Sequence, residues 1–142
     1  MNELLKEAIE ELAILHLYNG VQPSDLADAM YENPYLEFKI TKEVEQLIVG
    51  LCFLDECDGK STTVCMKYFY NLDKQLQRID QKIGLKRFST QWCRIQSTNE
   101  AIAKVERTLA MLEIDSVQTK AIMSTLPPNV RSLLRAKLSL AA

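Results

Sequence analysis

Apolar residues recur at helical spacing along most of the chain. Over residues 3–19 they return every three or four positions while glutamates occupy the first turns, a pattern typical of an amphipathic helix, and Gly20 follows as a stop signal. Pro23 and Pro34 are placed to begin and end a short second helix. Residues 35–40 alternate instead between apolar and polar, but no second strand is apparent to pair with them. They are therefore predicted to form an extended connector or an isolated edge segment.

The middle of the chain predicts longer helices. Thr41 is a candidate cap for a helix that would end before the turn signal at residues 58–61. The longest periodic run then places apolar residues at alternating spacings of four and three, which is a heptad pattern: Cys65, Phe69, Leu72, Leu76, Ile79 and Ile83. Gly84, in a left-handed conformation, would close this helix. Residues 89–113 also repeat every seven positions, and they form either one helix or two.

Two short helices complete the prediction, one from Asp115 or Ser116 to about residue 124 and one from Pro128 to Leu138. The predicted fold class is all-α: a single domain, residues 1–142, with six or seven helices around a long antiparallel helical hairpin made by residues 62–83 and 89–113. The heptad seam would serve either this internal hairpin or a homodimer, and the sequence leaves both open.

Composition supports a globular chain. The 142 residues include four Gly and four Pro, a quarter of them are charged, and no apolar run is long enough to cross a bilayer. Met1 leads into an acidic segment that does not resemble a secretory signal, so a cytoplasmic location is predicted. Four cysteines occur without a C-x-x-C pair and with His16 as the only histidine, which argues against a zinc site. Cys52 and Cys65 are predicted to be free thiols that pack as small apolar side chains.

Charge divides the chain into two unequal halves. Residues 1–60 hold four basic and thirteen acidic side chains, a net charge of −9, whereas residues 61–142 hold thirteen basic and six acidic ones, a net charge of +7. The halves either neutralise each other or meet partners of opposite sign. A partner-binding acidic surface is predicted from five residues of the first half: Glu37, Glu43, Glu45, Asp55 and Glu56.

The richest basic stretch, residues 79–96, has two interpretations. Ile83, Gly84 and Leu85 suit the tight turn of a helix-turn-helix that reads DNA, but the same residues suit the corner of a helical hairpin, which we favour. The residues that would contact nucleic acid or a protein partner are Lys82, Lys86, Arg87, Ser89, Thr90, Gln91 and Arg94.

No catalytic constellation, phosphate-binding loop or dinucleotide-binding turn is recognisable in the sequence. We therefore expect a non-enzymatic regulator or adaptor that acts through protein–protein interaction and uses no cofactor. The alternative is a helix-turn-helix-like transcriptional regulator that uses residues 82–96.

Overall fold

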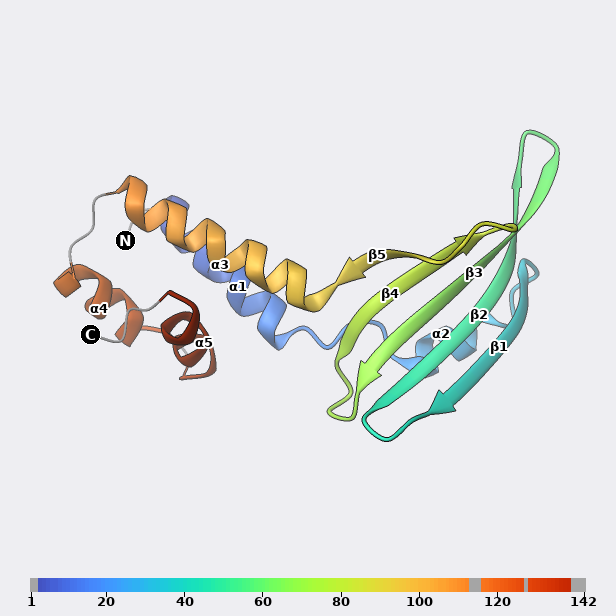
Figure 1. Ribbon diagram of the computed structural model, residues 1–142, viewed down its shortest axis with the longest axis horizontal. Coiled ribbons are helices and arrows are strands. Elements are labelled where there is room, and N and C mark those ends of the chain that lie inside the picture. Colours follow the sequence, from blue (N-terminus) through green and yellow to red (C-terminus); the bar gives the residue numbers. More distant parts are fainter. Residues whose placement is uncertain (1–2, 113–115, 127, 139–142) are drawn as a thin grey trace. The chain divides into compact units, whose positions relative to one another are not determined.

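The computed structural model describes residues 3–112, 116–126 and 128–138, and it shows an α+β fold (Figure 1). The chain runs through α1 (Glu3–Leu17), α2 (Pro23–Ala29), β1 (Tyr35–Lys42), β2 (Gln46–Cys57), β3 (Lys60–Asn71), β4 (Leu76–Ile83), β5 (Ser89–Cys93), α3 (Arg94–Met111), α4 (Ser116–Ser124) and α5 (Pro128–Leu138). The strands form one antiparallel sheet in the order β1-β2-β3-β4-β5, so every strand pairs with its neighbour in sequence.

The all-α prediction is wrong between residues 35 and 93. Residues 41–57 and 62–83, predicted as helices, belong to the sheet, as does the first part of the predicted helix 89–113. The heptad hairpin therefore does not exist, and a homodimer through its seam has no support. Residues 35–40 are extended as predicted, but they pair with β2, with an irregularity in the register at Leu36. Gly84 has the expected positive φ of 58°, in the turn between β4 and β5 and not at a helix end.

The other helices follow the sequence pattern. α1, α2, α4 and α5 lie where the caps and prolines place them, and α3 occupies most of residues 89–113. The alternative start of α4 at Asp115 lies outside the described residues. On α1 the buried side chains Leu5, Ala8, Ile9 and Leu12 form one stripe at helical spacing.

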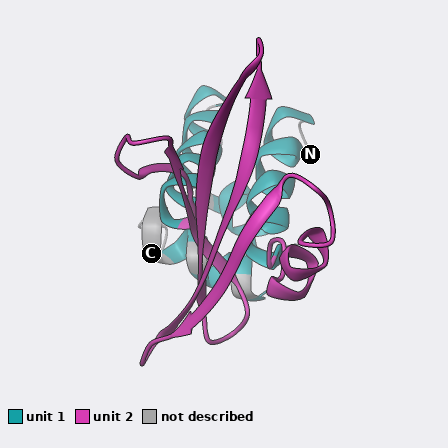
Figure 2. Ribbon diagram, turned by 90° about the vertical axis from the view of Figure 1, so that its right-hand side faces the viewer, with its two compact units in different colours: residues 1–18, 95–142 teal, residues 19–94 magenta. Residues whose placement is uncertain are grey.

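Contacts divide the chain into two compact units, shown in different colours in Figure 2. The first, the helical unit, comprises residues 1–18 and 95–142, and α1, α3, α4 and α5 share one apolar core within it. The second, the sheet unit, comprises residues 19–94, with α2 packed against the sheet. Its core joins Leu26 of α2 to Val49, Leu51, Tyr70 and Leu76 of the strands.

Two hydrogen bonds to backbone carbonyls hold the segment that enters the sheet unit. Leu76 N–H donates to the Asn19 carbonyl at 2.8 Å, and the Tyr70 hydroxyl donates to the Val21 carbonyl. Gly20 has a φ of 85°, and a Cβ added there would lie 2.6 Å from the Leu76 Cβ. Both the backbone conformation and the close approach therefore require glycine at this position.

We expect Gly20→Ala to destabilise the sheet unit by about 2–4 kcal/mol, because a left-handed alanine is strained and its methyl group would displace Leu76. Gly59→Ala is the matched control, since Gly59 has a φ of 76° but nothing within 4 Å of an added Cβ. The control should lose only about 1 kcal/mol, from backbone strain alone. Urea unfolding measures both. Equal losses would show that the contact with Leu76 adds nothing.

Tyr68 gives the core a dependence on alkaline pH. Burial first, and the neighbouring Tyr35 second, raise the pKa of Tyr68 above its ordinary value of 10.0. The folded state therefore favours the protonated phenol. The resulting stability is complete below pH 10.0 and is lost as the pH rises through the folded-state pKa.

Accordingly, the free energy of unfolding should fall more steeply above pH 10.0 in the native protein than in Tyr68→Phe, which has no phenol to ionise. Tyr31→Phe, at a residue that is 92% exposed, should keep the native slope. Urea midpoints measured across this pH range test the difference, and parallel curves for the native protein and Tyr68→Phe would contradict it.

Candidate functional site

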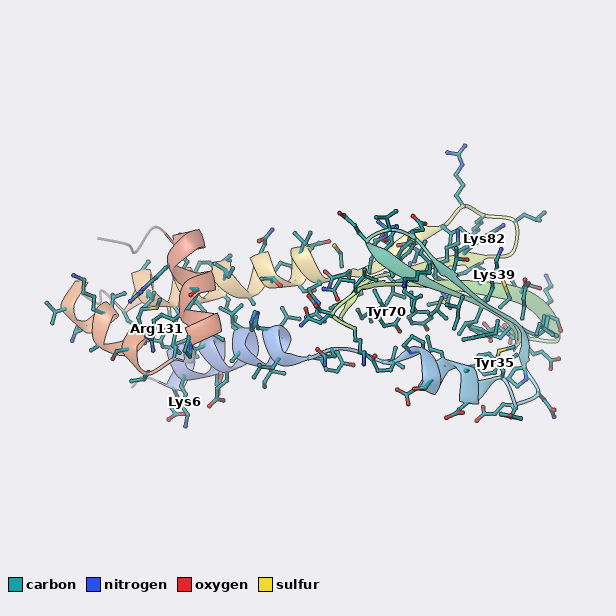
Figure 3. The ribbon with its side chains drawn as sticks, turned by 90° about the horizontal axis from the view of Figure 1, so that it is seen from below. Lys6, Tyr35, Lys39, Tyr70, Lys82 and Arg131 are labelled. Atoms are coloured by element: carbon teal, nitrogen blue, oxygen red, sulfur yellow. A yellow bond between two sulfur atoms is a disulfide. The ribbon has the colours of Figure 1, made fainter. Side chains whose placement is uncertain are left out.

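The strand register gives the sheet two different faces. Val49, Tyr70 and Leu76 point toward α2, and on each strand the residues that alternate with the core positions point the other way. Figure 3 shows this division, with Tyr35 and Tyr70 on the side of α2 and Lys39 and Lys82 on the opposite side of the sheet. No described element of the sheet unit covers this second side, which we call the open face.

A depression of about 190 Å³ lies on the open face. Its lining comes from β1, β2, β3, β4 and the turn after β4: Glu37, Lys39, Gly50, Leu51, Cys52, Cys65, Met66, Lys67, Lys82 and Phe88. Gly50 lies between Lys39 and Lys67 in the register, and an added Cβ there would meet nothing closer than 4.0 Å. The missing side chain leaves the middle of the depression open.

Phe88 gathers two of the lysines that line the depression. The Lys67 ammonium lies 4.5 Å from the Phe88 ring centroid, and the Lys82 ammonium lies 5.8 Å from it. Both distances are within the range of cation–π attraction. Phe88 is itself 37% exposed, so it offers apolar surface beside the two charges.

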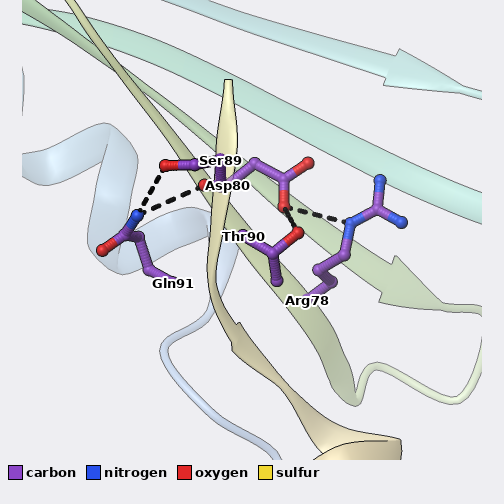
Figure 4. Close-up of polar contacts among 5 residues, drawn as sticks. All are labelled: Arg78, Asp80, Ser89, Thr90 and Gln91. Atoms are coloured by element: carbon purple, nitrogen blue, oxygen red, sulfur yellow. Dashed lines mark hydrogen bonds and ion pairs between the residues drawn. The ribbon is translucent and has the colours of Figure 1, made fainter. Parts of the chain in front are cut away.

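The acidic residue next to the depression is already neutralised. The Asp80 carboxylate lies 3.1 Å from Arg78 Nε and accepts a hydrogen bond of 2.9 Å from the Thr90 hydroxyl (Figure 4). Arg78 also lies over the ring of Phe69, with its guanidinium carbon 4.0 Å from the centroid. Asp80 lies opposite Lys67 in the register, but its carboxylate is paired with Arg78. Three lysines and one carboxylate, that of Glu37, remain in the lining, so the depression is basic.

The predicted basic contact residues are not arranged as a helix-turn-helix. Lys82 ends up in β4, Lys86 and Arg87 in the turn that follows, and Ser89, Thr90 and Gln91 in β5. Arg94 begins α3, but it is 9% exposed and donates from Nε to the Leu76 carbonyl at 2.7 Å. The recognition helix assumed for residues 82–96 is therefore wrong, because a strand occupies its place. Of this predicted set, only Lys82 lines the depression.

The predicted acidic surface is divided among three places. Glu37 lines the depression, Glu43 and Glu45 lie in the turn between β1 and β2, and Asp55 and Glu56 lie near the other end of β2. Glu45 and Asp55 are ten residues apart on an extended chain, which corresponds to about 30 Å. Glu43 and Glu45 line a separate cavity of about 760 Å³ with Val44, Gln46, Tyr70, Asn71 and Gln77.

Sequence reasoning missed Lys39, Lys67 and Phe88, and it misread two cysteines. Cys52 and Cys65 are joined by a disulfide between β2 and β3, so the prediction of two free thiols on helical stripes is wrong. The dipeptide Asp58-Gly59, with positive φ at both residues, is the hairpin signal that places these cysteines opposite each other.

In the part of the chain that the structure describes, no three His, Cys, Asp or Glu side chains cluster as metal ligands would. Within the same residues, no helix combines the length and apolar character needed to cross a bilayer. Searches of protein-family models, curated proteins and solved structures returned no match to the chain.

Proposed function

We propose that the protein is a non-enzymatic binding protein that holds an acidic segment of a protein partner on the open face of its sheet. The observation that supports this proposal is the basic depression, where three lysines from three strands surround an opening lined by one carboxylate. Complementary charge speeds association and selects among partners. The lining supplies both charge and apolar surface, which together suit recognition of a peptide.

The shape of the depression favours a peptide over a small anion. Phe88 and the disulfide provide apolar surface beside the lysines, and the opening above Gly50 leaves room for a side chain of the partner. A segment that alternates carboxylates with aliphatic side chains would satisfy both parts of this lining. Lysine suits such a partner because its flexible stem lets each ammonium follow a carboxylate.

Single-stranded nucleic acid is the second candidate. Phe69 and Phe88 lie among basic side chains, and aromatic rings beside lysines are typical of single-strand binding. Against this candidate, Arg78 already lies over Phe69 and Lys67 over Phe88, so a base would have to displace a cation. The acidic turns at both ends of β2 would also repel phosphates.

A cytoplasmic location remains part of the proposal. The disulfide between Cys52 and Cys65 is the observation that weighs against it, because disulfides persist mainly in oxidising compartments and are usually transient in the cytosol.

Reversing two charges in the depression should remove binding. We expect Lys67→Glu with Lys82→Glu to weaken binding of a fluorescent peptide that alternates glutamate with leucine by about tenfold or more, because attraction becomes repulsion. Lys6→Glu with Lys120→Glu is the matched control, since both lysines are exposed on helices and the change in net charge is the same. Fluorescence anisotropy gives the affinities, and circular dichroism shows that each variant is folded.

Two results would overturn the proposal. One is an equal loss of affinity in the two double variants, which would mean that only net charge matters. The other is that the native protein binds oligothymidylate more tightly than the peptide at the same salt concentration, with a steep dependence on salt, which would favour the nucleic-acid candidate.

A further inference from the structure

The disulfide lies inside the basic depression and not in the apolar core. Cys52 pairs with Cys65 in the register of β2 and β3, and both residues line the depression. Each is half-buried and not enclosed. A small thiol can therefore reach the bond from the open face.

The bond is not needed to define the hairpin. β2 and β3 remain paired from Gln46 opposite Asn71 to Cys57 opposite Lys60, on both sides of the disulfide. Asp58 and Gly59, both at positive φ, form the turn that this pairing requires. Opening the disulfide leaves these hydrogen bonds in place, so the bond can be made and broken within the folded sheet.

The two sulfur atoms have different electrostatic surroundings. Across the sheet the register forms one row, with Glu37 beside Cys52 and Lys82 beside Cys65. Lys67 lies two residues from Cys65, and Lys39 lies opposite Gly50, two residues from Cys52, so the direct neighbours Glu37 and Lys82 make the difference between the two sulfurs. An adjacent ammonium stabilises a thiolate and an adjacent carboxylate disfavours it. Cys65 is therefore the better leaving group of the pair, because the thiol that is more readily ionised leaves faster.

We propose that the disulfide between Cys52 and Cys65 is a thiol–disulfide exchange site for an external dithiol, with Cys52 as the sulfur that is attacked and Cys65 as the sulfur that leaves. This inference does not depend on the proposed function, because it concerns the chemistry of the bond and not the partner of the open face.

The exchange balances in two steps. A thiolate of the dithiol attacks Cys52 Sγ, a mixed disulfide forms, and Cys65 leaves as a thiolate that takes a proton. In the mixed disulfide the first sulfur of the reductant is bonded to Cys52. The second thiol of the reductant then attacks that first sulfur and releases Cys52 as a thiolate, which is also protonated. The protein gains two electrons and two protons, and the dithiol becomes a disulfide. Reoxidation reverses these steps: the Cys52 thiolate attacks the external disulfide and releases one of its thiolates, and the Cys65 thiolate then attacks Cys52 Sγ and releases the other.

The experiment uses the full chain with Cys57→Ser and Cys93→Ser, which removes the two free cysteines. The oxidised protein is treated with reduced glutathione, quenched and alkylated, and trypsin cleavage after Lys60 separates the two remaining cysteines for mass spectrometry. We expect glutathione on Cys52 and the alkyl group on Cys65. Dithiothreitol should then reduce the native protein without loss of its circular dichroism spectrum.

Two lysine variants test the role assigned to charge. Lys82→Gln should slow the reaction with glutathione by about threefold relative to its parent, which is the effect of one lost charge at a partly exposed site. Lys60→Gln, at the exposed end of the same hairpin, should react at the parent rate. Glu37→Gln should reduce the preference of glutathione for Cys52 over Cys65, because the carboxylate beside Cys52 is lost and the charges around the two sulfur atoms become more alike.

Three outcomes would each overturn the inference. In the first, glutathione is found mainly on Cys65. In the second, Lys82→Gln and Lys60→Gln react at the same rate. In the third, the native protein resists dithiothreitol and the denatured protein is reduced readily, which would make the disulfide purely structural. The peptide-binding assay tests a different property, so it can fail while this inference stands.

Discussion

The backbone of Leu76 is the point on which the sheet unit depends. Its N–H holds the entering segment at Asn19, and its carbonyl accepts the hydrogen bond from Arg94 where the chain leaves. The Leu76 side chain is 3% exposed and lies against Gly20, so the same residue also fills the core. The buried guanidinium is tolerated because it is hydrogen-bonded and lies 5.5 Å from the Trp92 ring centroid. Both ends of the unit are thereby tied to the first residue of β4.

The alternation of side chains along the strands then separates the packed face of the sheet from the open face. A helix of seven residues covers one face of the sheet, and that face takes the large apolar side chains. The lysines of the opposite face come from three strands, and they meet only because the strands pair in sequence order. Gly50 contributes by having no side chain where the strands would otherwise fill the space. The basic depression is thus a consequence of the register, and no single segment of the sequence contains it.

The sequence predicted the helices outside the sheet but not the sheet itself, for an identifiable reason. Residues 61–83 carry apolar side chains on both faces, so a heptad can be traced through Cys65 and Phe69. The side chains that pack inward on β3 instead occupy every second position: Val64, Met66, Tyr68 and Tyr70. Periodicity alone cannot separate these patterns. The run of β-branched and aromatic residues from 62 to 70, together with Asp58-Gly59, favours strands and a hairpin.

Prediction of the site required the register, which the sequence encodes only weakly. Lys82 was singled out as part of a helix, yet it is the register that brings it beside Cys65, and a slip of one residue would move it to the other face of the sheet. The disulfide joins Cys52 and Cys65 across the same register that assembles the lysines. Once formed, that pairing is held by twelve residue pairs and the turn. The turn and the ladder therefore define the register without the disulfide, which is the condition that the proposed exchange on the open face requires.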